Sequence, residues 1–164
     1  MGWTTRSTRS ATGQRFGAVA GQRYTAGFDT GSPKTYFEPD GFVDAGSPLP
    51  LIGSKLHVMN SKPPEALLVL EREGGVIISG DCLQNWAAAD EYFSGLGKFM
   101  MRLMGFIKPH NIGPGWLKQG KPPKADLAAI LDLTFEHVIP THGTAVIGQA
   151  RAKYKPALDV VSAS

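Results

Sequence analysis

Two short apolar runs separated by a charged turn constrain the fold of this 164-residue chain more than any other feature. Residues 66–70 and 76–79 are almost entirely aliphatic, and the turn between them reads Glu-Arg-Glu-Gly-Gly. Short aliphatic runs on either side of a glycine-containing turn are typical of an antiparallel hairpin. Because both runs are continuously apolar, we expect a hairpin in a sheet that is covered on both faces. Residues 55–59 are predicted to add a neighbouring strand.

Helical periodicity follows the hairpin. Residues 86–104 carry apolar side chains at helical intervals, which predicts one or two helices, with a break near Gly95 and Gly97. Prolines and glycines are frequent in residues 107–123 and oppose long regular structure there. We therefore expect an ordered loop held in place by Trp116.

The remaining pattern alternates helix with strand. Residues 124–135 have apolar side chains on one helical side, and residues 137–139 form a short apolar run that predicts a strand. A last helix is predicted over residues 147–161, broken or offset by Pro156. Strands that alternate with helices predict an α/β domain, with one sheet and flanking helices.

The first 50 residues do not share this pattern. They contain few aliphatic residues and many Gly, Ser, Thr, Arg and Pro, so we expect irregular chain. Residues 3–15 are unusually rich in Thr, Ser and Arg, and a reading-frame shift or a truncation is one hypothesis for their origin. Degenerate codons for this stretch also permit a shifted frame that encodes acidic and aromatic residues. We therefore assign residues 1–50 to an irregular N-terminal segment and residues 51–164 to the folded domain.

Charge and cysteine content argue against several classes of protein. The 17 Lys and Arg residues exceed the 14 Asp and Glu residues by only three, and they are mostly scattered, which argues against a nucleic-acid partner. Cys82 is the only cysteine, so the chain has neither an intramolecular disulfide nor a cysteine-built zinc cluster, and we expect a cytoplasmic location. No run approaches the roughly 18 apolar residues of a membrane span, so we expect no membrane partner.

Two potential metal ligands follow two of the predicted strands. The first motif reads Ile-Ile-Ser-Gly-Asp and ends at Asp81, and the second reads Val-Ile-Pro-Thr-His-Gly and contains His142. A strand end fixes a side chain while the following loop opens space around it. A carboxylate oxygen and a neutral imidazole nitrogen suit zinc or a related divalent ion.

This order of motifs resembles the C-terminal half of the metallo-β-lactamase superfamily. In that family the Gly-Asp aspartate bridges two metal ions and the His-Gly histidine binds one of them, so the resemblance implies metal-ligand roles for Asp81 and His142. Glu65, in Ser-Lys-Pro-Pro-Glu-Ala-Leu, stands where the family usually has a metal-binding histidine, and a carboxylate can also bind a metal. The resemblance covers residues 55–156. It implies a partial αββα sandwich, a zinc cofactor and hydrolysis of an unidentified small molecule.

The chain departs from the family upstream of these motifs. The family's His-x-His-x-Asp-His motif is absent from the sequence, and no histidine precedes His57. We therefore expect weak zinc binding or none, and an impaired or inactive enzyme. The alternative is a degenerate, non-catalytic module that binds a protein partner or self-associates. That alternative predicts an apolar stripe that stays partly exposed, formed by Phe93, Leu96, Phe99, Met100 and Leu103.

Each candidate ligand also has a purely structural interpretation. Asp81 could cap a following helix or brace a turn, and His142 could be a hydrogen-bonded turn residue. Glu65 could be a solvated loop acid. Cys82 is predicted to be a small buried apolar residue, because strand alternation directs it away from the side that Asp81 faces.

Overall fold

The computed structural model describes residues 18–19, 22–23, 49, 51–62, 64–89 and 91–163. The chain divides into two units, Met1–Ile52 and Gly53–Ser164. In the first unit, strands β1 (Ala18–Val19) and β2 (Gln22–Arg23) pair antiparallel. The frame-shift hypothesis and most of the expected irregular segment concern residues outside the described part of the chain.

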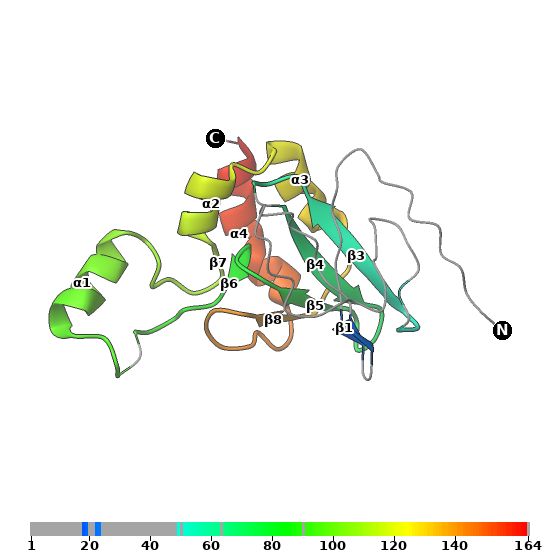
Figure 1. The fold of residues 1–164 in the computed structure, drawn as a ribbon, viewed down its shortest axis with the longest axis horizontal. Helices are drawn as coiled ribbons and strands as arrows, with labels where there is room; N and C mark the ends of the chain where they lie inside the picture. The colour runs from blue at the N-terminus through cyan, green and yellow to red at the C-terminus, as the bar shows by residue number, and fades with distance from the viewer. Residues whose placement is uncertain are drawn as a thin grey trace. The chain divides into compact units, whose positions relative to one another are not determined.

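The second unit is built on a four-stranded sheet with the order β3-β4-β5-β8 (Figure 1). The strands are β3 (Ser54–Met59), β4 (Glu65–Leu70), β5 (Val76–Ser79) and β8 (His137–Pro140). The first three pair antiparallel, and β5 pairs with β8 in parallel. The predicted hairpin, its neighbouring strand and the late strand are all confirmed, and the unit is a mixed α/β domain.

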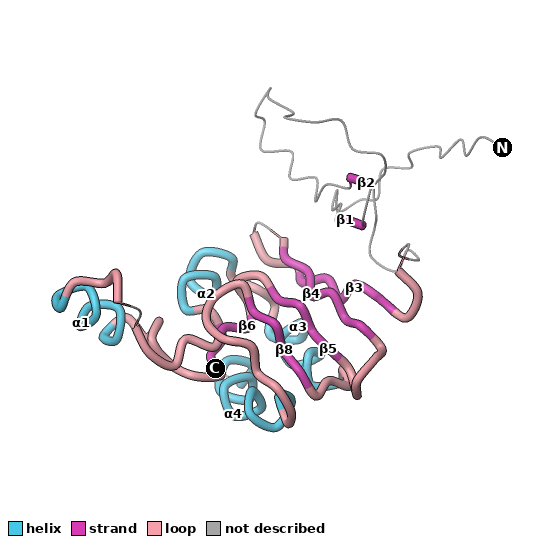
Figure 2. Tube along the Cα trace, turned by 90° about the horizontal axis from the view of Figure 1, so that it is seen from below, coloured by secondary structure: helices cyan, strands magenta, loops and turns pink. Residues whose placement is uncertain are grey.

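Helices α3 (Lys124–Ala129) and α4 (Ala150–Ala163) lie on one face of this sheet (Figure 2). A 3-10 turn, η1 (Ile130–Asp132), extends α3, so the predicted helix over residues 124–135 ends earlier than expected. Buried side chains of the sheet and the helices meet between them, where each large apolar side chain stabilises the fold by about 1.5–3 kcal/mol. They include Leu67, Val69, Ile77, Val138, Leu127, Ile130, Tyr154 and Leu158.

The expected burial of both sheet faces is wrong at β5 and at its neighbour β8, which is an edge strand. Ile77 on β5 and Val138 on β8 are fully buried, but their neighbours Ile78 and Ile139 are 39% and 46% exposed. Successive side chains of a strand point to opposite faces, and α3 and α4 cover only one of them. A continuous apolar run therefore does not guarantee two covered faces.

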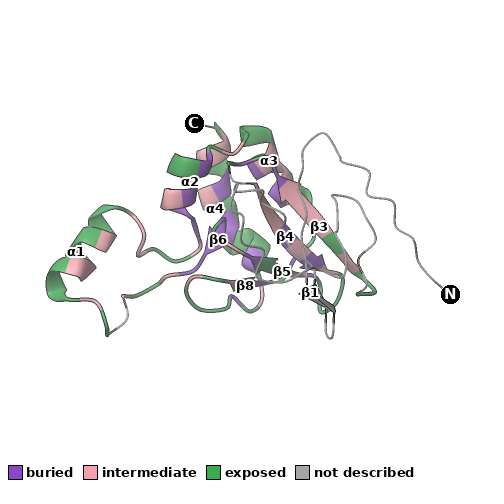
Figure 3. Cartoon of the chain, in the orientation of Figure 1, coloured by how far each residue is buried: buried purple, intermediate pink, exposed green. Residues whose placement is uncertain are grey.

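Helix α1 (Gly95–Leu103) is shorter than predicted. Ser94 precedes it, and its Oγ accepts a hydrogen bond from the Gly97 amide at 3.1 Å, so the glycines lie at the start of the helix instead of breaking it. Residues 86–89 and 91–94, which were expected to be helical, are not. Before them, strand β6 (Leu83–Gln84) pairs with β7 (Asn111–Ile112). No residue of α1 is buried, and α1 extends away from the sheet and the other helices (Figures 1 and 3).

The expected loop over residues 107–123 contains regular structure. It includes β7 and helix α2 (Pro114–Gly120), which begins at a proline because the first turn of a helix needs no donor there. Trp116 on α2 is only 8% exposed, and its indole nitrogen donates to Ser61 Oγ at 3.3 Å. Trp116 thus holds this segment against the β3–β4 connection.

Helix α4 begins later than predicted and continues through Pro156. Proline removes one helical hydrogen bond, but buried Tyr154 and Leu158 on either side keep the helix on the core. Within the described residues, no helix has both the length and the apolar character needed to cross a membrane.

Candidate metal site

The parallel pairing of β5 with β8 brings Asp81 and His142 together. Ser79 is the register partner of Pro140, so each candidate ligand lies two residues beyond a paired position at the same sheet edge. His142 Nε2 is 2.8 Å from Asp81 Oδ1. The predicted proximity of these two side chains is confirmed, whereas metal binding stays a prediction.

Backbone hydrogen bonds fix the two loops that carry these side chains. The amide and the hydroxyl of Thr141 both donate to the Ser79 carbonyl at 2.9 Å. The Asn85 amide donates to the His142 carbonyl at 3.0 Å. Gly143 has a φ of +97°, and a side-chain carbon there would overlap the Asn85 carbonyl. Glycine is therefore needed beside His142 for the two loops to approach this closely.

Trp86 gives His142 a second support. The two rings stack with centroids 6.0 Å apart and planes inclined by 25°. The His142 and Asp81 side chains nevertheless remain 42% and 59% exposed, so a solute can reach both. The cap interpretation of Asp81 is wrong, because the element that follows is β6 and not a helix. His142 Nε2 contacts Asp81 Oδ1. The same nitrogen would serve a hydrogen-bonded turn residue or a metal ligand, so this contact fits both interpretations of His142.

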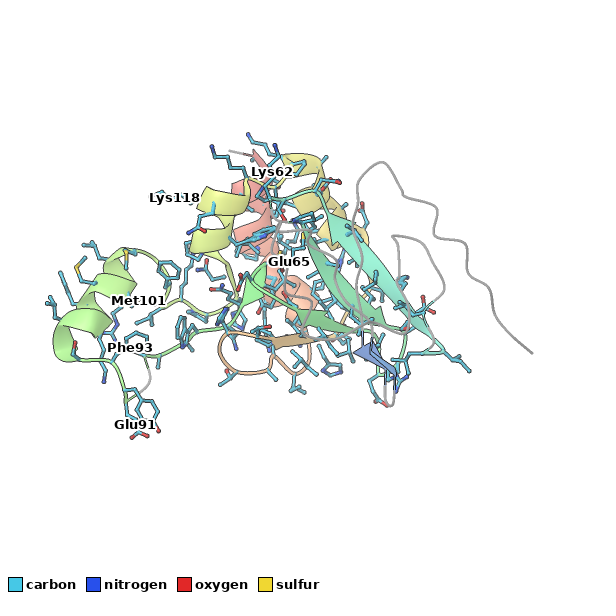
Figure 4. All side chains as sticks on the ribbon, in the orientation of Figure 1. Lys62, Glu65, Glu91, Phe93, Met101 and Lys118 are labelled. Carbon is cyan, nitrogen blue, oxygen red and sulfur yellow. The ribbon has the colours of Figure 1, made fainter. Side chains whose placement is uncertain are left out.

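The purely structural interpretation of Glu65 as a solvated loop acid is wrong. It is the first residue of β4, and its Oε1 accepts a hydrogen bond from the Cys82 amide at 2.7 Å. Burial raises the pKa of Glu65 to about 7, and the negative charge of Asp81 adds to this effect against the opposing hydrogen bond from Cys82. Figure 4 shows Glu65 within the body of the unit. The carboxylate thus borders the backbone that carries Asp81.

Cys82 is fully buried, which confirms the prediction of a small core residue. Burial raises the pKa of its thiol, and the nearby Glu65 carboxylate raises it further. A thiol in this state is a poor nucleophile and a poor metal ligand.

Within the described residues, two of the three candidate ligands have side chains that meet. Asp81 and His142 offer one oxygen and one nitrogen, but a catalytic zinc normally needs three protein ligands. Glu65 directs Oε1 to a backbone amide. Over the described ranges, no group of three or more His, Cys, Asp and Glu side chains is arranged to hold a metal ion.

No family model, curated protein or solved structure matches the chain. The assignment of a function therefore depends on the residues and their geometry. Two residues of the site, Asn85 and Trp86, were not predicted from the sequence. Both contact the His142 loop only through the tertiary fold, and neither lies in a spacing that would have marked it.

Proposed function

We propose that this chain corresponds to the C-terminal half of a metallo-β-lactamase-like hydrolase whose metal site is incomplete. The observation that carries the proposal is the 2.8 Å contact between Asp81 and His142 at the ends of adjacent parallel strands. The sheet covered by α3 and α4 on one face supports it, because such a layer is half of an αββα sandwich. The domain binds zinc weakly and has little or no hydrolytic activity.

Ligand supply is the physical reason for the impaired activity. In a complete site, the metal supplies an activated water and polarises the scissile bond. Two solvent-exposed ligands leave an ion free to tilt and exchange, and catalysis tolerates only small displacements of the attacking group. Asp81 and His142 consequently hold an ion loosely and do not orient a substrate.

Metal analysis of purified protein tests this proposal. After exposure to zinc and extensive dialysis, we expect less than one zinc per chain, and a further loss in Asp81→Ala and His142→Ala. The matched controls are Asp132→Ala, which removes an exposed aspartate on η1, and His57→Ala on the far strand β3. Hydrolysis of generic ester, lactam and phosphodiester substrates should be equal in the original protein and in Asp81→Ala.

Two outcomes would contradict the proposal. Equal zinc uptake in all variants would remove Asp81 and His142 as ligands. One tightly bound zinc per chain, together with hydrolysis abolished by His142→Ala, would show a competent site and reject the impaired enzyme.

The second candidate function is a non-catalytic module that binds a protein partner or self-associates. Exposure of the apolar stripe on α1 favours it: Leu96, Phe99 and Leu103 are 72%, 62% and 71% exposed. Met100 is also exposed. Of the stripe only Phe93, which precedes α1 and whose ring forms a T-shaped pair with that of Trp86, is half-buried. Substituting this stripe separates the two functions, because α1 contributes no ligand to the Asp81–His142 pair.

A further inference from the structure

A groove runs between helix α4 and the loop that leads from α1 to α2. Its volume is about 510 Å³, within the range of small-molecule sites. Its walls are mainly apolar and include Ile112, Leu117, Pro156, Ala157, Val160 and Val161. A ligand in this groove would cover aliphatic side chains from three elements.

Two lysines and a histidine line the same groove, and no carboxylate side chain does. Lys108, His110 and Lys153 contribute to its lining, which contains no Asp or Glu. Within the described part of the chain, neither lysine forms an ion pair, and the Lys153 ammonium donates to the Gly148 carbonyl at 2.9 Å. Lys108 and Lys153 are both exposed residues. A lining with positive charge and no negative charge favours an anionic partner through charge complementarity.

His110 is held in one geometry on the groove wall. Its φ of 49° is unusual for a residue other than glycine, and its amide donates to Asn85 Oδ1 at 3.2 Å. The ring packs edge-on against Tyr154 with centroids 5.7 Å apart. Burial lowers the pKa of His110 and the charge of Lys153 lowers it further, so the neutral imidazole can donate one hydrogen bond. The wall is therefore formed before a ligand arrives.

We propose that this groove binds a medium-chain fatty-acid-like carboxylate. The carboxylate head pairs with Lys108 and Lys153, and the aliphatic body lies on Ile112, Leu117 and Val160. Charge complementarity selects the head, and the apolar walls select the tail. This binding site is independent of the Asp81–His142 pair, so its test does not depend on zinc binding.

An NMR titration of the full chain with decanoate tests the proposal. We expect saturable shifts of the His110, Ile112 and Val160 amides, and binding at least about tenfold weaker for acetate, which lacks the tail, and for 1-decanol, which lacks the charge. Lys108→Gln and Lys153→Gln should each weaken decanoate binding by about fivefold, as expected for partly exposed charge pairs. Val160→Asp should abolish it, because Val160 is 65% exposed and its replacement adds a repelling charge without disturbing the core.

Lys118→Gln is the matched control, since Lys118 is exposed on α2 and does not line the groove (Figure 4). It should leave decanoate binding unchanged, and circular dichroism should show that all variants remain folded. Equal binding of 1-decanol and decanoate would overturn the anion assignment. Tighter binding of decyl phosphate would overturn the carboxylate in favour of a phosphate head. An equal loss in Lys118→Gln and Lys153→Gln would show a non-specific charge effect and reject the site.

Discussion

Glu65 holds an acidic group in a largely buried position beside the backbone of residues 80–82. The Cys82 amide donates to it, and a side-chain carbon at Gly80 would lie 3.3 Å from its Oε1. Glycine at position 80 therefore makes room for this carboxyl group. The cost of ionising Glu65 in such surroundings makes the stability of the domain sensitive to pH.

We expect the free energy of unfolding to fall by about 2–3 kcal/mol between pH 4.5 and pH 8 because of Glu65. Its pKa is about 7 in the folded protein against 4.5 ordinarily, so the folded state keeps a proton that the unfolded chain releases. The stabilisation is complete below about pH 4.5 and is lost as the pH rises through 7. Urea denaturation across this range measures it.

Glu65→Gln keeps the acceptor for the Cys82 amide and removes the titration, so its unfolding free energy should depend much less on pH in this window. Glu73→Gln, at an exposed turn position, should behave like the original protein. A pH dependence that persists unchanged in Glu65→Gln would assign the effect to another group.

Single residues differ in how far the sequence could predict them. Asp81 and His142 each follow a strand that the sequence pattern predicts, but their proximity was expected from the resemblance of the motif order to the metallo-β-lactamase superfamily, because a local pattern does not say which strands are neighbours. The environment of Glu65 depends on which amides lie near it after folding. Asn85 and Trp86 reach His142 across a long sequence separation, which no local periodicity encodes.

Helix α1 is an amphipathic element without a covering partner among the described residues. Its apolar residues face outward, and its nine residues include two basic side chains, Lys98 and Arg102, and no acidic one. Apolar side chains left in water at 60–70% exposure contribute little to the stability of the folded unit. They remain free to contribute to association.

Replacing Leu96 and Leu103 together by glutamate should reduce self-association without lowering the free energy of unfolding. Sedimentation velocity over a concentration series measures the first effect, and urea denaturation measures the second. Lys118→Glu makes the same change of two charge units outside α1 and should leave association as it is. A large loss of stability in the double variant would show instead that these leucines pack in the folded protein.

Elements with a strong local signal were predictable, and those created by context were not. The aliphatic runs on either side of a glycine turn gave β4 and β5 correctly. Strands β6 and β7 contain two residues each, too few for any periodicity, and they form because the chain segments meet in space. Helix α2 arose in a proline-rich stretch because Pro114 occupies the one helical position where proline is favoured.

At the scale of the whole molecule, the described core lies entirely between Met59 and Leu158. It includes side chains from β3, β4, β5 and β8 together with those of α2, α3 and α4. The predicted boundary near residue 50 lies close to the division between Met1–Ile52 and Gly53–Ser164. The second unit therefore has a hydrophobic core of its own, as an independently folding domain does.

We expect a fragment of residues 53–164 to fold alone, with a cooperative urea transition at the same midpoint as the full chain. Its buried side chains come from the same fragment, so removing residues 1–52 should leave the transition unchanged. Well-dispersed amide NMR signals would provide independent support. A fragment that lacks a cooperative transition would show that the first unit contributes to the core.

Helix α1 lies within the long connection between β5 and β8, so its position bears on how these two strands are held together. The two strands are hydrogen-bonded neighbours, yet α1 lies between them in the sequence and extends away from the body (Figure 1). Covalent continuity through α1 is thus not what holds the two strands in register. A protease cut within this helix would leave two pieces that stay assembled through the sheet, and an inserted sequence at the same place would extend outward without displacing the core.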